Sequence, residues 1–289
     1  MILVAGATGV TGGRVVHKLL AKGVPVRALV RESSDHAALV EAGAEIAFAD
    51  LKEPLSIRKA MEGVTRVVST ATASSRGGDD TIESVDRIGT ASLIEASRES
   101  GVERFVFVSA WGFKKDMGIA IARAKVENEE RLQESGVPYT ILYPVLFMDV
   151  WIGWVIGSQL QHGDQVRILG GKDARYGFIA AENVADVAVA ALGEPRAENA
   201  KITLCAEVAT FPDVVKKIAK ATGRSLEVEA VEPKEFEGLP PMVIELWGKM
   251  SALEPPEPTD EVFASFGVRP VGLDDFLPQA FRPATAGAV

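Results

Sequence analysis

The sequence predicts an α/β fold, with a doubly wound parallel sheet followed by a smaller C-terminal α+β lobe. Three observations support this fold class. Short apolar runs alternate with stretches of helical spacing in the first half, a glycine-rich turn joins the first run to the first helix, and the alternation loosens after about residue 145. Strands that alternate with helices form parallel sheets whose two faces are both covered by helices.

The predicted strands of the sheet are six apolar runs. They span residues 2–5, 24–30, 44–49, 65–70, 104–109 and 138–144. Apolar residues at helical spacing predict helices over residues 11–22, 35–42, 54–62, 79–100 and 117–135. Gly101 and Gly136 follow the last two helices, where glycine readily adopts the left-handed conformation that ends a helix.

The second half of the chain has a different composition. Residues 145–160 are apolar nearly all round, 182–192 predict a helix with Asn183 near its start, and "KITLCA" and 226–231 predict strands. We therefore expect a first domain over residues 1–145 and a lobe built mostly from 146–289. A segment at about 175–205 is expected to return to the first domain.

The bulk composition excludes several functional classes. The 289 residues are 47% hydrophobic and 25% charged, as in ordinary globular proteins. Thirty-one Lys and Arg residues against 40 Asp and Glu give a net charge of −9, which argues against nucleic-acid binding. Cys205 is the only cysteine and is expected to be buried, and the three histidines match no metal-ligand spacing.

The chain also lacks the signals of a membrane protein. No run of about 18 apolar residues predicts a membrane span, and Met1 leads straight into a strand rather than a signal peptide. We expect a cytoplasmic protein, monomeric or homodimeric, that acts on a small molecule, with no metal, no nucleic acid and no membrane.

The glycine-rich turn, "GATGVTGG" at residues 6–13, predicts a dinucleotide-binding loop of the Rossmann type. Gly6 allows the sharp turn, Gly9 allows the backbone to approach a pyrophosphate, and Gly12 allows the helix to pack closely on the strand. The helix N-terminus offers free N–H groups and a positive dipole end to the phosphates. Thr8, Val10 and Thr11 belong to the same turn and are expected to contact the cofactor.

The end of the second strand predicts a preference for NADP(H) over NAD(H). An acidic residue at this place binds the ribose 2′-hydroxyl of NAD, whereas an arginine accommodates the 2′-phosphate of NADP. Here Val30 occupies the acidic place, Arg31 follows it, and Glu32 comes one residue late.

Several segments together resemble a known family. "ILVAGATGVTGG", "VRALVRESS", "FADL", "VERFVFVSAWG", "ARAKVENEERLQESGVPYTIL" and "FIAAENVAD" are similar to the atypical short-chain dehydrogenase/reductases, in their NmrA-like branch. That branch includes NAD(P)H:quinone oxidoreductase-like proteins, the isoflavone-reductase group and NADP-sensing regulators. The resemblance covers nearly the whole chain and implies a Rossmann-like sheet with a small C-terminal substrate lobe.

The resemblance also implies roles for individual residues. It places Gly6, Gly9 and Gly12 at the pyrophosphate, Arg31 at the 2′-phosphate, Asp50 and Leu51 beside the adenine, Ser69, Thr70 and Ala71 along the cofactor, and Lys125 at the nicotinamide ribose. Tyr143, Pro144 and Phe147 would border the nicotinamide and the substrate, although the family often has arginine where Tyr143 stands.

The sequence departs from the catalytic members at the proton-donating site. Those members have a serine after the fifth strand and a tyrosine four residues before the lysine. Here Ser109 remains beside the cofactor, but Ala110 occupies the usual catalytic serine position and Ile121 replaces the tyrosine. A positioned acid typically contributes about 10²–10⁴-fold in rate, so the usual ketone-reducing chemistry is not expected.

Lys125 is therefore expected to position the cofactor rather than to tune a tyrosine. Residues 121 and 125 share one helical face, which predicts that Ile121 packs inward and Lys125 follows it. The alternative is an exposed lysine paired with Glu127 or Glu129. Tyr143 and Tyr176 are the candidate replacements for the missing acid.

Three functions remain open at this stage. The first is an NADPH-dependent reductase that transfers hydride to a small apolar acceptor, such as a quinone or an activated alkene or carbonyl, without the tyrosine acid. The second is an NADP-sensing regulator, and the third is a non-redox isomerase or cyclase. A reductase pocket would be lined by Trp111, Phe113, Met148, Trp151, Trp154 and Trp247, unless these residues form the core of the lobe.

Overall fold

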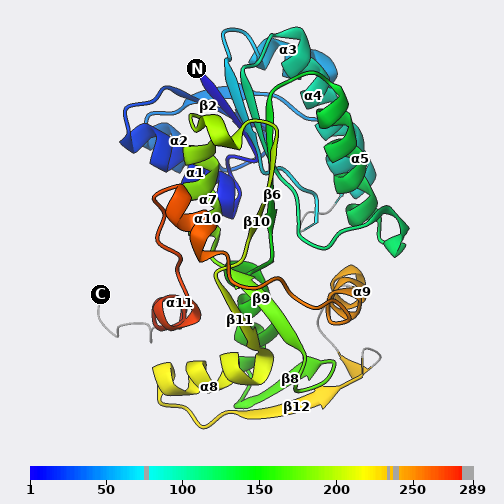
Figure 1. Ribbon diagram of the computed structural model, residues 1–289, viewed down its shortest axis with the longest axis vertical. Coiled ribbons are helices and arrows are strands. Elements are labelled where there is room, and N and C mark those ends of the chain that lie inside the picture. The colour runs from blue at the N-terminus through cyan, green and yellow to red at the C-terminus, as the bar shows by residue number, and fades with distance from the viewer. Residues whose placement is uncertain (75–77, 233–234, 237–240, 282–289) are drawn as a thin grey trace. The chain divides into compact units, whose positions relative to one another are not determined.

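The computed structural model of the protein describes residues 1–74, 78–232, 235–236 and 241–281 (Figure 1). Its described residues fall into two compact units. The first comprises Met1–Pro144, Ala181–Thr203 and Val262–Val268, and the second comprises Val145–Ala180, Leu204–Glu261 and the described part of Arg269–Val289.

The first unit contains a seven-stranded sheet with the strand order β10-β6-β5-β4-β1-β2-β3. The strands are β1 (Ile2–Ala5), β2 (Val26–Val30), β3 (Glu45–Phe48), β4 (Arg66–Ser69), β5 (Arg104–Val108), β6 (Tyr139–Pro144) and β10 (Ala200–Leu204). Neighbouring strands from β3 to β6 are parallel, and the order reverses between β1 and β4. The six predicted strands and the doubly wound, Rossmann-like fold class are confirmed.

Helices cover both faces of this sheet (Figure 1). One layer holds α1 (Val10–Ala21), α2 (Ala37–Glu41) and α7 (Ala181–Ala191), and the other holds α3 (Pro54–Ala60), α4 (Thr90–Glu99) and α5 (Ala120–Glu134). Short 3₁₀ turns lie at Lys115–Met117 and Pro195–Ala197, and α10 spans Asp260–Ser265. Burial on both faces explains why the strands read as continuous apolar runs: Leu3, Phe105 and Ile141 are fully buried.

The helix expected over residues 79–100 differs from the prediction. It begins as a π-helix, η1 (Ile82–Gly89), and continues as α4. Asn128 of α5 donates hydrogen bonds from Nδ2 to the carbonyls of Asp86 and Arg87, at 2.6 and 3.2 Å. The wider turn of a π-helix leaves backbone carbonyls without their usual helical donors, and here the Asn128 side chain donates to them. The helical spacing in the sequence does not reveal this tertiary contact.

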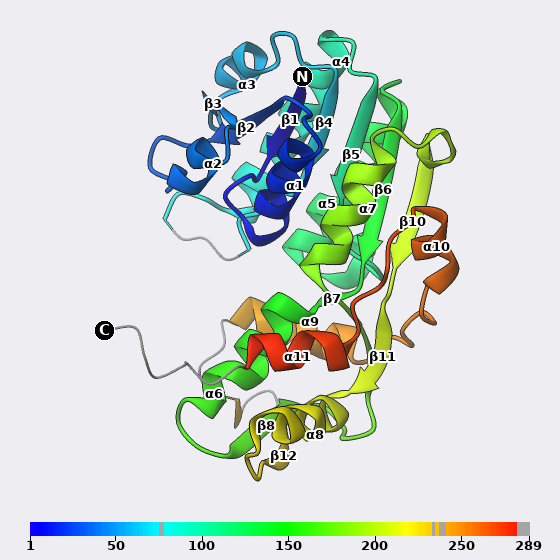
Figure 2. The same cartoon turned by 90° about the vertical axis from the view of Figure 1, so that its left-hand side faces the viewer.

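Helix α7 returns from the second half of the chain and packs on α1 (Figure 2). Lys18 of α1 forms ion pairs with Glu182 and with Asp186, the latter at 2.7 Å, and Arg14 lies 3.2 Å from Glu182. These partly exposed ion pairs join two helices that are far apart in sequence, although such pairs contribute little to stability.

The second unit holds two small sheets and several helices. Its strands are β7 (Leu146–Phe147), β8 (Gln165–Leu169), β9 (Arg175–Ile179), β11 (Glu207–Thr210) and β12 (Glu227–Val231), arranged as β11-β9-β7 and β12-β8. Its helices are the π-helix η3 (Met148–Gly157), α6 (Ser158–Leu160), α8 (Phe211–Thr222), α9 (Pro241–Met250) and α11 (Leu273–Ala280). The apolar run at 145–160 is therefore mostly helical and buried, with Ile152 and Val155 fully inaccessible.

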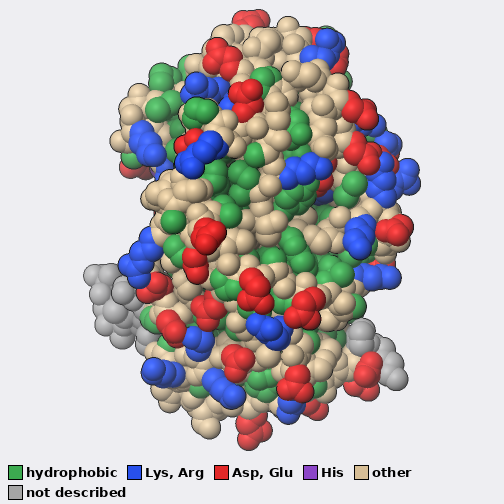
Figure 3. Space-filling model, in the orientation of Figure 1, with side chains coloured by type: hydrophobic (Ala, Val, Ile, Leu, Met, Phe, Trp, Pro, Cys, Tyr) green, Lys and Arg blue, Asp and Glu red, His purple; other side chains and the backbone are tan. Residues whose placement is uncertain are grey.

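The surface agrees with the charge balance of the sequence. Acidic and basic side chains are interspersed over the face drawn in Figure 3. Among the described residues, none of the helices has both the length and the apolar character needed to cross a bilayer.

The glycine turn generates a prediction for stability. A Cβ atom at Gly12 would lie 2.1 Å from the carbonyl oxygen of Gly6, whereas one at Gly13 would lie 3.4 Å from that of Ala7. Because overpacking costs typically about 1–3 kcal/mol, Gly12→Ala should lower the free energy of unfolding by about that amount. Gly13→Ala, the matched control in the same helix, should leave it unchanged or raise it by up to about 1 kcal/mol. Urea unfolding followed by circular dichroism measures both, and equal stabilities of the two variants would contradict the close packing.

Candidate functional site

The residues expected to bind a cofactor in the first unit follow the carboxyl ends of its parallel strands. Gly6 follows β1, Arg31 follows β2, Asp50 follows β3, Thr70 follows β4 and Ser109 follows β5. Carboxyl ends of parallel strands share one edge of the sheet, and ligands of open α/β sheets bind there, at the point where the strand order reverses. In this sheet that point lies between β1 and β4.

The glycine turn is built for close approach at this edge. Gly6 has a φ of +84°, and a Cβ there would lie 2.6 Å from Thr70 Oγ1 and 2.8 Å from the nitrogen of Ala71. Gly9 is the N-cap of α1, and no side chain caps the first turn of that helix. The uncapped N–H groups at the N-terminus of α1 suit an anionic ligand.

Thr70 joins the turn to the fourth strand. Its backbone N–H donates to Ala5 O at 2.9 Å, and its hydroxyl donates to the same oxygen at 3.2 Å. Beside it, Ser69 Oγ is buried and has no hydrogen-bond partner among the described residues. An unpaired buried hydroxyl is unfavourable, so its presence at the ligand edge is consistent with a polar ligand group.

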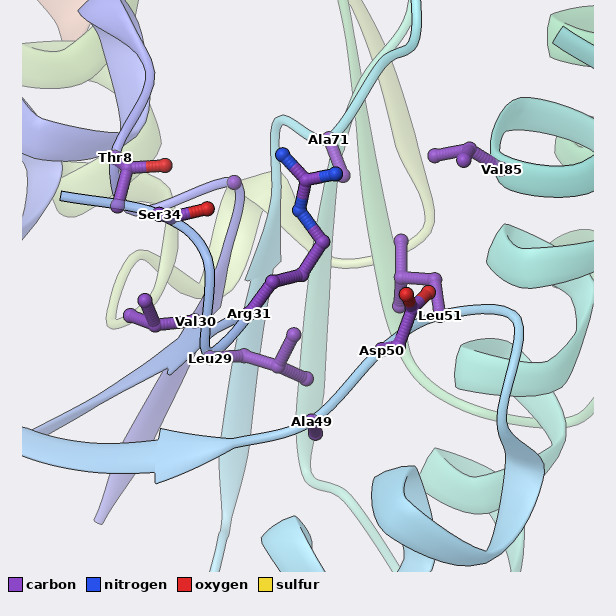
Figure 4. A pocket seen from close by; sticks show the side chains of 11 residues that line it. Thr8, Leu29, Val30, Arg31, Ser34, Ala49, Asp50, Leu51, Ala71 and Val85 are labelled. Atoms are coloured by element: carbon purple, nitrogen blue, oxygen red, sulfur yellow. The ribbon is translucent and has the colours of Figure 1, made fainter. Parts of the chain in front are cut away.

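A pocket opens beside the turn, between the loops that follow β2 and β3 (Figure 4). Among the sequence-predicted residues, its lining brings together Gly6, Thr8, Arg31, Asp50, Leu51 and Ala71. Figure 4 shows the Arg31 side chain reaching across the opening, with Thr8 and Ser34 on one side and Asp50 and Leu51 on the other. Val10 is half exposed at the start of α1, and Thr11 is partly buried there.

Arg31 does not stand alone in this pocket. Its guanidinium forms an ion pair with the buried carboxylate of Asp80, whose other oxygen accepts a hydrogen bond from Lys52 Nζ at 2.8 Å. Lys52 also lies 3.6 Å from Asp50, and the hydrogen bond to Asp80 raises the pKa of the Lys52 ammonium. Sequence reasoning missed Lys52 and Asp80, although Lys52 directly follows the "FADL" segment.

Lys125 lies on the same edge and is buried. Its Nζ donates to the carbonyl of Val108, the last residue of β5, at 3.1 Å and lies 4.9 Å from the centre of the Phe107 ring. The side chain of Ile121 is buried one turn earlier, which confirms the inward-facing pair. The alternative of an exposed lysine paired with Glu127 or Glu129 is therefore wrong.

Burial dominates the electrostatics of Lys125. Desolvation lowers the pKa of its ammonium below the usual value, and the carboxylates of Asp86 and Glu129 partly oppose that shift. A cation kept in such an environment destabilises the fold, and groups with strongly perturbed pKa values cluster at functional sites.

Glu129, one turn after Lys125, is the acceptor of a buried hydrogen-bond cluster. Tyr143 donates from its hydroxyl to Glu129 Oε2 at 2.7 Å, and Ser109 donates to Glu129 Oε1. Sequence reasoning noted Glu129 only as a surface partner. Ile121, Lys125 and Glu129 follow one another at intervals of four residues. This spacing places all three on one helix face and was the signal in the sequence.

This arrangement weakens Tyr143 as a replacement acid. Burial and the Glu129 carboxylate both raise the pKa of Tyr143 strongly, because a phenolate beside a carboxylate is unfavourable. A lysine ammonium beside a tyrosine would have the opposite effect on its pKa. The raised pKa disfavours Tyr143 as a proton donor, and its position at the end of β6, beside Pro144, is as expected.

Tyr176, the other candidate acid, is a core residue. It is buried in the second unit, accepts a hydrogen bond from Trp247 Nε1 at 2.9 Å, and its pKa is raised by burial. Trp247 itself is fully buried, packs against Phe211 with ring centroids 4.9 Å apart, and meets Trp151 edge-to-face at 6.2 Å. These aromatic residues belong to the core of the second unit. They therefore match the alternative interpretation, in which they are core residues and not the lining of a substrate pocket.

The remaining residues of the expected substrate pocket divide between the units. Trp111 and Phe113 are half-buried in the first unit, and Phe147, in β7, is half-buried in the second. Met148 is buried and lines a cavity of the second unit together with Ile152, Phe276 and Phe281. The side chain of Trp154 lies outside the described residues.

The structure gives no metal site within the part of the chain that it describes: no cluster of three or more His, Cys, Asp or Glu residues is suited to hold an ion. Cys205 is buried as expected, and desolvation raises the pKa of its thiol to about 12. A thiol so strongly protonated is not a nucleophile.

Fold and site together define a nucleotide-binding α/β protein of the Rossmann type. A family model described as NAD(P)H-binding matches residues 6–195, so the chain belongs to that family. This match confirms the expected NAD(P)H-binding family, and solved structures at 17–22% identity share the fold, whereas the finer place in the NmrA-like branch of the atypical short-chain dehydrogenase/reductases stays a prediction.

Individual relatives agree with this assignment. The chain is 29% identical to an NAD(P)H azoreductase from Xenophilus azovorans over 264 residues, which cover 89% of this chain and 88% of the azoreductase. It is 39% identical over 141 residues to the photosystem II assembly factor Ycf39 from Trieres chinensis, but that match spans only 48% of this chain and 44% of the factor. Among solved structures, the NADPH-dependent quinone oxidoreductase QOR2 of Escherichia coli, complexed with NADPH, superposes with a TM-score of 0.80 at 20% identity, covering 97% of this chain and 100% of that chain.

The buried lysine generates a prediction for the pH dependence of stability. The pKa of Lys125 lies below the usual value of 10.5 in the folded state, so the unfolded state binds the proton more tightly. The resulting destabilisation is present in full below the folded pKa and disappears as the pH rises through about 10.5. Lys125→Met should therefore raise the free energy of unfolding at pH 7, and its advantage over wild type should shrink as the pH rises.

Denaturant unfolding at a series of pH values tests this expectation. Lys114→Met, at an exposed lysine, serves as the control and should show no such gain at pH 7. An advantage of Lys125→Met that stays constant up to pH 11 would contradict the depressed pKa.

Proposed function

We propose that the protein is an NADPH-dependent reductase that acts on a small apolar acceptor, a quinone, an azo compound or an activated alkene or carbonyl, without a tyrosine acid. The observation that carries the proposal is the buried Lys125 on the sheet edge that also holds the glycine turn. The similarity to an NAD(P)H azoreductase over most of both chains supports it.

The residues present suit a dinucleotide. Gly9 lets a pyrophosphate approach the uncapped end of α1, Gly6 and Gly12 keep the turn close to the strands, and the pocket beside Asp50 and Leu51 suits an adenosine. When bound, the reduced nicotinamide supplies a hydride. The further proposed contacts are Ser69, Thr70, Ala71, Ser109, Lys125, Pro144 and Phe147.

Two cations at this pocket favour the 2′-phosphate of NADP. Arg31 lines the pocket, and Lys52 shares with it the carboxylate of Asp80. Val30, which ends β2, offers no carboxylate to a ribose hydroxyl.

The chain's own residues then orient the cofactor and exclude water, and they do not donate a proton. Lys125 can donate to ribose hydroxyls from the end of β5, while Ile121 occupies the place of the tyrosine. The Ser109–Glu129–Tyr143 cluster holds β5, α5 and β6 together but resists losing the Tyr143 proton. Acceptors whose reduced form takes its proton from solvent fit such a site, and simple ketones do not.

A cofactor-sensing or assembly role is the second candidate. Two observations favour this role. About half of this chain is 39% identical to an assembly factor, and the tyrosine is missing. Incubation with NADPH and a panel of quinones and azo dyes, followed by the loss of nicotinamide absorbance, separates the two. Turnover with one acceptor class supports the reductase, whereas tight NADPH binding without any turnover supports the sensor.

The cofactor preference predicts the behaviour of an arginine variant. Since a hydrogen bond to a charged group contributes roughly 1.5–3 kcal/mol, Arg31→Ala should weaken NADP binding by about one to two decades. NAD binding should change little. Isothermal titration calorimetry measures both affinities, with Arg98→Ala as an exposed control. Equal losses for the two dinucleotides would refute the role of Arg31.

The raised pKa of Tyr143 predicts a mild variant. If Tyr143 were the general acid, Tyr143→Phe would cost about 10²–10⁴-fold in kcat. We expect a loss below about tenfold instead, with the optimum pH unchanged, because the phenol keeps its proton. Steady-state kinetics with the best acceptor of the panel measure this. A hundredfold loss of kcat at unchanged KM would restore Tyr143 as the acid.

A further inference from the structure

We infer that Asp80 is an internal anion that occupies the phosphate-binding cations of the adenosine pocket, competes with the 2′-phosphate of NADP, and so sets the balance between NADP and NAD. This inference rests on the proposed dinucleotide function. It adds a specificity-determining residue that lies far in sequence from the strand end usually inspected for this choice.

The carboxylate of Asp80 is held by both cations at once. Its Oδ2 pairs with Arg31 Nη1, and its Oδ1 lies 2.8 Å from Lys52 Nζ. The Asp80 side chain is only 5% exposed, whereas those of Arg31 and Lys52 are 30% and 29% exposed. The acid is therefore the desolvated member of the cluster, and the two cations are the members that solvent or a ligand can reach.

Cations and carboxylates already pair with one another in this cluster without any ligand. Arg31 and Lys52 supply two positive charges, and Asp80 and Asp50 supply two negative ones within ion-pair distance. A ribose 2′-phosphate carries about −1.5 to −2 at neutral pH, so its arrival on Arg31 would place a second anion near the carboxylate of Asp80 in a partly buried site. Like charges close together in a partly buried site repel each other, so NADP binding is opposed as long as Asp80 holds both of its cations.

NAD has no 2′-phosphate, so its binding brings no second anion to this cluster. Its 2′-hydroxyl needs an acceptor, and a carboxylate is the group that NAD-binding sites provide for it. Val30 leaves the strand end without one, but Asp80 keeps a carboxylate on Arg31, which lines the pocket. Asp80 itself is buried and does not belong to the pocket lining, so NAD would meet Arg31 with its carboxylate partner still in place.

Asp80 has one rival role, in which it stays in place and orients Arg31 and Lys52 for the phosphate. The two roles predict opposite effects of removing its charge. A competitor lowers NADP affinity, so Asp80→Asn should tighten NADP binding. An orienting residue raises it, so the same variant should weaken NADP binding.

Calorimetric titration of NADP⁺ and NAD⁺ into the full-length protein tests the inference. For Asp80→Asn we expect NADP⁺ binding tighter by roughly tenfold and NAD⁺ binding unchanged or weaker, so that the preference for NADP⁺ rises. Asp79→Asn is the matched control, since it removes the same charge at the neighbouring, exposed aspartate, and should leave both affinities unchanged. Weaker NADP⁺ binding by Asp80→Asn, or an unaltered ratio of the two affinities, would overturn the inference.

A thermal-shift measurement and the Arg31→Ala variant complete the test. If Asp80→Asn folds poorly because two cations lose their partner, the rise in Tm on addition of NADP⁺ still reports binding, and it should exceed the rise seen for wild type. An equal or smaller rise would count against the inference. Arg31→Ala separates the two levels: if it leaves NADP⁺ binding unchanged, the proposed cofactor site itself is wrong. If it weakens NADP⁺ while Asp80→Asn fails to tighten it, only the role of Asp80 is wrong.

Discussion

The close packing of the first helix on the first strand is the constraint on which the rest of the nucleotide-binding unit depends. Gly6 turns with a positive φ, and Gly12 lies so near its carbonyl that no side chain fits between them. Thr70 then ties the same turn to the end of β4. One small region thus fixes the N-terminus of α1, the reversal of the strand order and the floor of the pocket. A bulkier turn would displace all three together.

The first unit also contains several charged side chains in buried positions. Lys125, Glu129 and Asp86 are buried around the end of β5, and Asp80 is buried between two cations. Buried charges destabilise a fold unless they are paired and hydrogen-bonded, and not every one of these groups is fully compensated. Asp86, for example, accepts a hydrogen bond from the nitrogen of Ala73 through one oxygen and leaves the other without a partner among the described residues. Such groups collect at the ligand edge of the sheet rather than in its apolar interior, which is the pattern of a functional site.

The chemistry of the Lys125 region follows from what surrounds it. In relatives with a tyrosine, a lysine stabilises the phenolate and makes the tyrosine an acid. Here the nearest phenol, Tyr143, faces the carboxylate of Glu129 instead, and its proton is held more tightly. Under the proposed function, Lys125 positions the cofactor and no tyrosine protonates the acceptor. This combination is consistent with acceptors that need a hydride and a dry surface more than a protein acid.

The sequence by itself determined the parts that follow from periodicity and local backbone geometry. The strand runs, most helices, the glycine turn and the inward-facing pair of Ile121 and Lys125 could all be read from spacing, because apolar alternation and glycine requirements are local properties. Only the tertiary structure decided which distant groups meet. The ion pair of Arg31 with Asp80 and the hydrogen bond of Tyr143 to Glu129 join residues 49 and 14 positions apart in different elements, and the core position of Trp247 depends on aromatic partners from several segments. Charges and aromatic rings have no period that marks a partner, so their pairing is fixed by the packing of strands and helices and not by the sequence around each residue.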